Sequence, residues 1–222
     1  RDSLTPAILE GSICMDGRII TTARLMMGVI YVVSGLNWWF KMITPYPSIS
    51  DFVSSPPPPD MVGEMIKTGV LFHIVKGTEL LAGLALLGNR FVPLMLVAVL
   101  PITINIAIVD VFFIAHLRGI VMGSGSFILN IFLMLAYIGH YRGVLTVRAT
   151  PDLAGEAAPV DDSSSVAPAL ARGLSRIMPF FGAFAILMAV AMLYFVTTLM
   201  IQYAQNPLPL SALHPPSPPP AH

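Results

Sequence analysis

The chain has 222 residues, of which 55% are hydrophobic and only 11% are charged. A soluble domain has roughly a quarter of its residues charged, so this composition excludes an ordinary soluble protein and indicates that lipid surrounds most of the chain. The 12 Lys and Arg residues balance 12 Asp and Glu residues and form no basic patch, so no nucleic-acid partner is indicated.

The apolar residues gather in five stretches along the chain. A helix needs about 20 apolar residues to cross a hydrocarbon core roughly 30 Å thick, and these stretches reach or approach that length. The alternating segments of about ten residues that build a membrane barrel are not visible. We therefore predict an all-α membrane protein with spans at about 22–43, 68–88, 92–115, 120–140 and 177–203.

The segments between the spans suggest how the chain is organised. Residues 22–145 are expected to form a four-helix transmembrane bundle, preceded by an N-terminal cytoplasmic segment at 1–21. Prolines at 44–66 favour extended backbone and predict an outer loop between the first two spans. Residues 146–176 have little apolar content and are expected to form a cytoplasmic linker, which makes the fifth helix an addition to the four-helix unit. A Pro-rich periplasmic tail is expected at 204–222.

The positions of the cations predict the orientation, because short loops rich in Lys and Arg stay on the cytoplasmic side. With the N-terminus inside, only Lys41, Lys67 and Arg118 fall outside, whereas the inner side holds Arg18, Arg24, Arg90, Arg142, Arg148, Arg172 and Arg176. We expect a multi-pass protein of the bacterial inner (cytoplasmic) membrane, and this bias predicts that its N-terminus is cytoplasmic and its C-terminus periplasmic. Trp38 and Trp39 then lie at the outer end of the first span, as interface anchors.

Polar side chains at membrane depth are the candidate site. A charge near the centre of a spanning helix costs roughly 2.5–3.5 kcal/mol, so such residues usually face the bundle interior or water. His73, Lys76 and Glu79 follow one another at intervals of three on one broad face of the second span, where Lys76 and Glu79 can pair. The pattern predicts a polar pocket that opens outward, either a quinone or lipid site or a structural network, completed by Ser34, Asn37, Asn105, Asp110 and Asn130.

Proline and glycine indicate how the helices pack. Pro101 removes a backbone donor in the middle of the third span, which predicts a kink, and Asn105 one turn later is expected to bridge to a neighbouring helix. Small residues let membrane helices approach closely. We expect this packing role for Gly28, Gly35, Gly69, Gly77, Gly83, Gly123 and Gly125.

The stretch from Arg24 to His116 resembles the DoxX-like membrane proteins. The resemblance rests on ARLMMGVIYVVSGLNWWF, on TGVLFHIVKGTELLAGLALLGNRFVPL and on VLPITINIAIVD, with Lys76, Glu79, Gly83, Asn89, Arg90, Pro101 and Asn105. It covers roughly residues 20–145 and implies a DoxX-like four-helix transmembrane bundle, to which this chain adds a fifth C-terminal transmembrane helix. The family includes a quinone-linked branch that oxidises thiosulfate. Asp110 stands where such proteins often carry a histidine, which argues against transferring a histidine-dependent activity.

The first functional hypothesis is an accessory or assembly subunit of a larger bacterial membrane complex, respiratory or photosynthetic. The chain has no evident redox ligands of its own and little extramembrane mass, and its fifth helix and tail offer a means of holding a neighbour. On this hypothesis the chain is non-catalytic, and its polar residues hold the bundle together. No cofactor is needed within the chain alone, although the alternative hypothesis allows a bound quinone or lipid. The expected partners are the lipid bilayer and other membrane protein subunits.

The alternative is a quinone-binding component of a DoxX-type thiosulfate or sulfur oxidoreductase. His73 or Lys76 would then bind the quinone oxygen, and Glu79 or Asp110 would exchange the accompanying proton. A metal or haem site is not indicated, since Cys14 is the single cysteine and no histidine spacing suits ligation. A transporter is disfavoured because four core helices show no inverted repeat.

Overall fold

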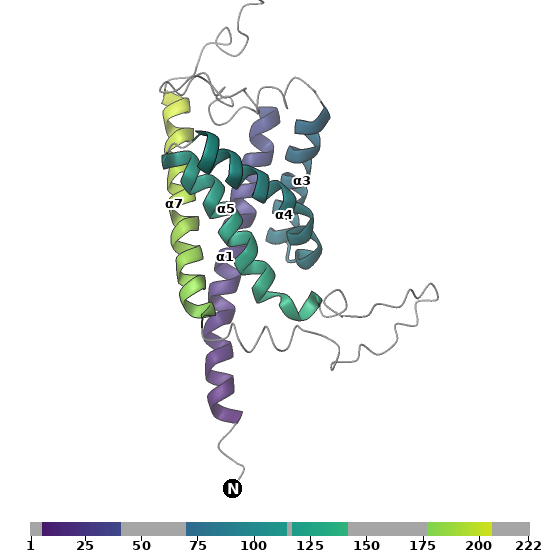
Figure 1. Cartoon of the computed structure of the whole chain (residues 1–222), viewed down its shortest axis with the longest axis vertical. Coiled ribbons are helices and arrows are strands. Elements are labelled where there is room, and N and C mark those ends of the chain that lie inside the picture. The colour runs from purple at the N-terminus through teal and green to yellow at the C-terminus, as the bar shows by residue number, and fades with distance from the viewer. Residues whose placement is uncertain (1–5, 41–69, 115–116, 142–176, 206–222) are drawn as a thin grey trace, which may run out of the picture.

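The computed structural model describes residues 6–40, 70–114, 117–141 and 177–205 (Figure 1). Within these ranges the chain forms α1 (Pro6–Phe40), α3 (Val70–Leu87), α4 (Val92–Ile108), the π-helix η2 (Val109–Ile114), α5 (Leu117–Ala136), the short 3-10 helix η3 (Ile138–Tyr141) and α7 (Met178–Gln205). Several predicted features lie outside the described residues, namely Lys41, Gly69, Lys67, the outer loop at 44–66, the linker at 146–176 and the tail beyond residue 205.

The described helices confirm the predicted all-α membrane class. Five of them are long and apolar enough to cross a membrane, over Gly17–Phe40, Val70–Leu87, Val92–Phe112, Leu117–Ala136 and Met178–Gln205. The described residues contain no strand. Successive helices run in alternating directions, so the start of α1 and the end of α7 lie at opposite ends of the bundle (Figure 1).

Two boundaries differ from those predicted. The first helix begins at Pro6 rather than near residue 22, and its first turns extend beyond the other helices (Figure 1). The third span is not one continuous α-helix, because after Ile108 the backbone changes to the π-helix η2. Hydropathy detects neither change, since helix extension beyond the lipid and a change of hydrogen-bond register leave the apolar content unaltered.

A tight turn joins α3 to α4. Asn89 and Phe91 adopt left-handed backbone conformations, with φ of 51° and 54°, which stop helix propagation. The Arg90 amide donates to the Ala85 carbonyl at 2.9 Å, satisfying one carbonyl at the end of α3. Pro93 lies in the first turn of α4, where a backbone N–H has no acceptor within the helix. The missing N–H of proline therefore costs no hydrogen bond, and proline is suited to starting this helix.

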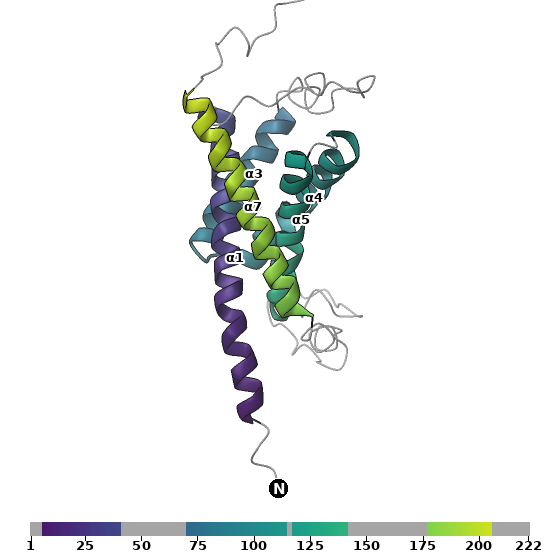
Figure 2. The ribbon, with the colours of Figure 1, turned by 90° about the vertical axis from the view of Figure 1, so that its left-hand side faces the viewer.

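The helices form a ring in which α1 packs on α3, α5 and α7, and α4 packs on α3 and α5. Helix α7 crosses diagonally over α1 and α5 (Figure 2). Its buried residues Ala185, Ala189 and Met192 join Met27 of α1 and Leu129 of α5 in one hydrophobic cluster. The fifth helix is therefore packed into the hydrophobic core of the bundle.

The contact between α1 and α3 brings the two backbones together. A Cβ added at Gly83 would lie 2.7 Å from the Val32 amide nitrogen and 2.9 Å from the Gly28 carbonyl oxygen. The predicted packing role is confirmed for Gly28, Gly35, Gly83, Gly123 and Gly125, where an added Cβ would meet atoms of another helix at 2.9 Å or less. It is wrong for Gly77, which has no such atom within 4 Å.

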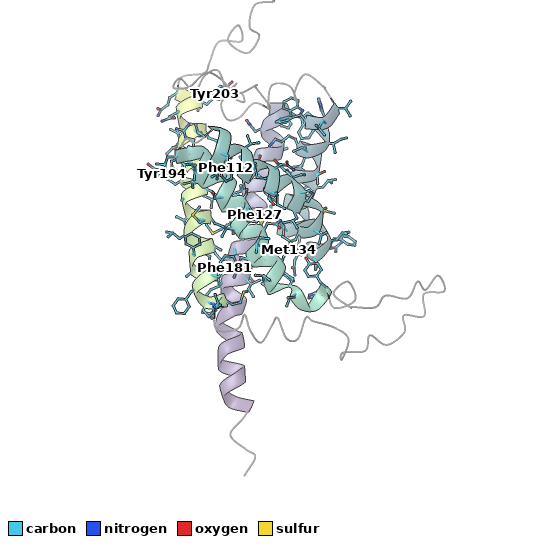
Figure 3. All side chains as sticks on the ribbon, in the orientation of Figure 1. Phe112, Phe127, Met134, Phe181, Tyr194 and Tyr203 are labelled. Atoms are coloured by element: carbon cyan, nitrogen blue, oxygen red, sulfur yellow. The ribbon has the colours of Figure 1, made fainter. Side chains whose placement is uncertain are left out.

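Aromatic side chains lie towards both ends of the bundle. Phe181 is near the start of α7, and Tyr203 is near its other end (Figure 3). Trp39 is 46% exposed at the end of α1, where an interface anchor is expected. Trp38 is instead half-buried and packs on Phe72 of α3, with ring centroids 4.7 Å apart. One of the two tryptophans thus stabilises a helix contact.

Candidate functional site

Three polar side chains form a closed cluster between α1 and α3. The Lys76 ammonium lies 2.8 Å from Glu79 Oε2, which confirms the pair predicted from their spacing. The Ser34 hydroxyl donates to the same carboxylate oxygen at 2.7 Å and accepts from Lys76 Nζ at 3.0 Å. Lys76 is 5% exposed and Glu79 2% exposed. We call Ser34, Lys76 and Glu79 the charged triangle.

The charged triangle is arranged so that each charge is compensated. A buried ion pair is tolerated when its geometry is good and further hydrogen bonds satisfy its remaining atoms, and the Ser34 hydroxyl serves both partners. The Lys76 ammonium also lies 5.5 Å from the centroid of the Phe72 ring, within the range of a cation–π contact. The triangle therefore joins α1 to α3 without an unpaired charge in the core.

His73 lies apart from the charged triangle although it shares the predicted spacing. Its side chain is exposed, whereas Lys76 and Glu79 are buried. The imidazole packs edge-on against Trp38, with ring centroids 5.0 Å apart. The first half of α3 thus exposes one aromatic group on the bundle surface and buries two charges inside the bundle.

A second polar group links α1, α5 and α4. Asn130 is fully buried, and its Nδ2 donates to the Leu96 carbonyl of α4 at 3.2 Å. The Tyr31 hydroxyl and Asn130 Oδ1 are both buried and have no partner in hydrogen-bonding geometry among the described residues, although the two side chains are neighbours. Glu79 also acts electrostatically on Tyr31. Together with the charged triangle, this group places polar contacts on all four helices of the predicted bundle.

Tyr31 is the residue that sequence reasoning missed. It is 4% exposed in the middle of α1. Its position three residues before Ser34 places it on the same face of the helix, and this spacing was the available signal. Because tyrosine is amphipathic and common at membrane interfaces, its hydroxyl was not counted among the polar groups at depth.

Asp110 lies on η2, half-buried against α5. A Cβ added at Gly123 would lie 2.7 Å from Asp110 Cβ and 2.8 Å from its Oδ2, so the glycine makes room for this carboxylate. Lys76 of α3 acts electrostatically on Asp110. The structure thus places Asp110 against α5, and its grouping with the polar residues of the second span stays a prediction.

The two remaining predicted residues behave differently. Asn37 is 5% exposed, one turn beyond Ser34 on α1. Asn105 is exposed, and its Nδ2 donates to the Pro101 carbonyl of its own helix at 2.8 Å. The expected bridge from Asn105 to a neighbouring helix is therefore wrong, and α4 itself continues through Pro101 to Ile108. Within the described residues, no group of three or more His, Cys, Asp or Glu side chains could hold a metal ion.

The comparison with protein families agrees with the resemblance. The DoxX family model matches residues 19–117, which include most of α1 and the whole of α3, α4 and η2, and end at the first residue of α5. Neither a curated protein nor a solved structure gave a significant match to the chain. The match takes in the charged triangle and Asp110, but not Asn130 or α7. The chain is therefore an integral membrane protein whose residues 19–117 form a DoxX-like unit.

Proposed function

We propose that this chain is a non-catalytic accessory subunit of a larger bacterial membrane complex, respiratory or photosynthetic. The observation that carries the proposal is the charged triangle. Its ammonium, carboxylate and hydroxyl groups bind one another at 2.7–3.0 Å and so hold α1 against α3. Groups engaged in this way serve packing, which is the role expected of the polar core in a subunit that performs no chemistry.

The arginines at one end of the bundle support a location in the inner membrane with the N-terminus in the cytoplasm. Arg18 and Arg24 lie near the start of the first span, and Arg90 lies in the turn between α3 and α4. These positions are at the same end because α1 and α3 run in opposite directions (Figure 1). A cluster of cations at one end is typical of the cytoplasmic side.

Neutralising the charged triangle tests whether it is structural. Lys76→Met leaves the Glu79 carboxylate buried without its ion pair and should lower the free energy of unfolding by about 3–5 kcal/mol. Adding Glu79→Gln removes the second charge but keeps an acceptor for Ser34, so the double variant should recover most of that loss. Unfolding by dodecyl sulfate in mixed micelles measures the free energy of unfolding of the wild-type protein, of Lys76→Met and of the double variant. A double variant as unstable as Lys76→Met would contradict the structural role.

Purification in a mild detergent or nanodiscs tests the subunit role. Affinity capture of the chain from its native membrane should recover one set of other membrane proteins in fixed stoichiometry, identified by mass spectrometry. The complex assembled with the double variant should keep its wild-type electron-transfer rate. A homogeneous isolated chain with full activity, or a folded double variant that abolishes the activity of the complex, would refute the proposal.

A second candidate, a quinone-binding oxidoreductase component, is favoured by the group around His73. This imidazole is exposed on the bundle surface and packs edge-on against Trp38. Quinones are dissolved in the lipid, so an exposed donor next to an aromatic ring suits the quinone oxygen and ring. On this candidate Glu79 or Asp110 exchanges the proton, and an electron donor is a partner subunit.

Quinone binding can be read directly from tryptophan fluorescence. The chain has two tryptophans, and Trp38 contacts His73. A short-chain ubiquinone analogue should quench the tryptophan fluorescence of the wild-type protein in nanodiscs, and the quenching should saturate. His73→Leu should weaken binding of the analogue at least tenfold. The matched control His140→Leu, at the other end of the bundle, should bind it as tightly as the wild-type protein. Equal quenching of all three proteins would exclude His73 as a quinone ligand.

A further inference from the structure

Asn105 is an exposed amide within the third span. At roughly 1.5 Å per residue, it lies about 20 Å from the start of the span at Val92 and about 10 Å from its end at Phe112. The other exposed amides of the described spans, Gln202 and Gln205, lie in the last turn of α7. Asn105 is therefore the exposed amide of these spans that lies well inside the hydrocarbon.

The hydrogen-bonding capacity of Asn105 is only partly used. An asparagine side chain offers two N–H donors and a carbonyl acceptor. One N–H donates to the Pro101 carbonyl of the same helix at 2.8 Å. No hydrogen bond among the described residues uses the second N–H or Oδ1. Because lipid tails offer neither donors nor acceptors, these two groups are stabilised only by a partner outside the described helices.

The residues in line with Asn105 form a surface suited to a second helix. Helix α4 packs on α3 and α5 and buries Val92, Leu96, Val99 and Thr103. The opposite side of the helix exposes a line of five residues, which we call the α4 seam: Leu94, Ala98, Pro101, Asn105 and Ile108. Their separations alternate between four and three residues, and this average of about 3.5 keeps one line of side chains facing a partner helix. A single asparagine in such a line specifies register and oligomeric state.

A second copy of the chain supplies the partner that Asn105 needs. Two copies inserted in the same direction are related by a twofold axis along the membrane normal, so a residue at the axis meets itself at the same depth. Each Asn105 can then donate its second N–H to Oδ1 of the other, which satisfies all four groups. The α4 seam contains no ionisable side chain, so its copies do not repel each other. A helix of another protein would have to supply a matching polar group at this depth.

We propose that the α4 seam is the interface of a homodimer, in which the Asn105 side chains of two copies form a reciprocal pair of hydrogen bonds inside the membrane. This contact joins two chains and is distinct from the bridge within one chain that the sequence suggested. It does not depend on the proposed subunit role, because the purified chain alone should form it.

Fluorescence energy transfer between copies in liposomes tests the dimer. The full chain is labelled with donor or acceptor at its single cysteine, Cys14, and the protein-to-lipid ratio is varied. Asn105→Leu should raise the dimer dissociation constant roughly sevenfold, because two interhelical hydrogen bonds of about 0.6 kcal/mol each are lost. Gln202→Leu, which removes an exposed amide at the end of α7, should leave the constant unchanged. Energy transfer that stays at the level of random encounters, or an unchanged constant in Asn105→Leu, would overturn the proposal.

Disulfide cross-linking in the native membrane tests the same interface without altering Asn105. In a Cys14→Ser background, Ile108→Cys places a thiol on the α4 seam, and oxidation should link two copies of the chain. The matched control Leu187→Cys, on the 62% exposed Leu187 of α7, should not cross-link. Equal dimer yields from the two variants would place the contact elsewhere and refute the proposed interface. Cross-linking of Ile108→Cys to a different protein alone would show that another subunit covers the α4 seam, and would also refute the homodimer.

Discussion

The close contact between α1 and α3 makes a quantitative prediction about Gly83. In Gly83→Ala the new methyl group lies 2.7 Å from the Val32 nitrogen and 2.9 Å from the Gly28 oxygen, whereas ordinary van der Waals contact begins at 3.4 Å. Both neighbours are backbone atoms, so no change of rotamer relieves the overlap. The two helices must separate, and overpacking of this kind typically costs about 1–3 kcal/mol.

Gly77→Ala provides the matched control on the same helix. No atom lies within 4 Å of its added Cβ, so the substitution introduces no overlap. Alanine is more favourable than glycine within a helix by up to about 1 kcal/mol, so this variant should be as stable as the wild-type protein or slightly more stable. The two alanine variants should therefore differ in their free energy of unfolding by roughly 1–4 kcal/mol.

Unfolding by dodecyl sulfate in mixed micelles, followed by tryptophan fluorescence, measures this difference. Trp38 packs on Phe72 of α3, so its emission reports on the same helix pair. Separation of the helices at Gly83 also pulls Glu79, one turn earlier, away from Ser34, and the emission of folded Gly83→Ala should shift. Equal midpoints for the two alanine variants would refute the close backbone contact and the packing role assigned to Gly83.

Three further substitutions test contacts elsewhere in the bundle. The Tyr141 hydroxyl donates to the Pro93 carbonyl at 2.8 Å, and burial raises the pKa of Tyr141 from 10.0 to about 12. The neutral hydroxyl should therefore contribute fully to the free energy of unfolding below pH 10, and its contribution should be lost as the pH rises through about 12. An ultraviolet titration of Tyr141→Phe should lack one tyrosine that ionises near pH 12. Arg24→Met removes a buried charged donor to the Leu86 carbonyl and should lower the free energy of unfolding by about 1.5–3 kcal/mol in the dodecyl sulfate assay. Gly182→Val enlarges a residue whose added Cβ already lies 2.9 Å from a side chain of α1, and should loosen α7, seen as weaker cysteine cross-linking of α7 to α1.

The sequence was most informative where chemistry alone determines the outcome. Apolar length predicted the spanning helices, and the spacing of Lys76 and Glu79 predicted their ion pair, because two opposite charges three residues apart in lipid have few other partners. Both predictions depend on local sequence and on the cost of charge in a membrane. Neither requires knowledge of which helices are neighbours.

The sequence was least informative about which way each helix faces. In a soluble helix the apolar stripe shows the buried face, but in these helices almost every face is apolar, so the rotation of Asn105 about the axis of α4 was not determined. Its side chain reaches the Pro101 carbonyl one turn earlier instead of another helix. The π-helix adds a second obstacle, because its i to i+5 bonds change the direction of Asp110 relative to residues on α4.

The contacts of α1 suggest where the bundle is rigid and where it can respond. One face of this helix binds α3 at three levels, by Arg24 at the end of α3, by the backbone contact at Gly28 and by Ser34 in the charged triangle. Every one of these contacts involves backbone atoms or paired charges, so α1 and α3 should move as one body. Because η2 lacks regular α-helical hydrogen bonds and packs on α4 and α5, the end of the third span should deform more easily than the contact between α1 and α3.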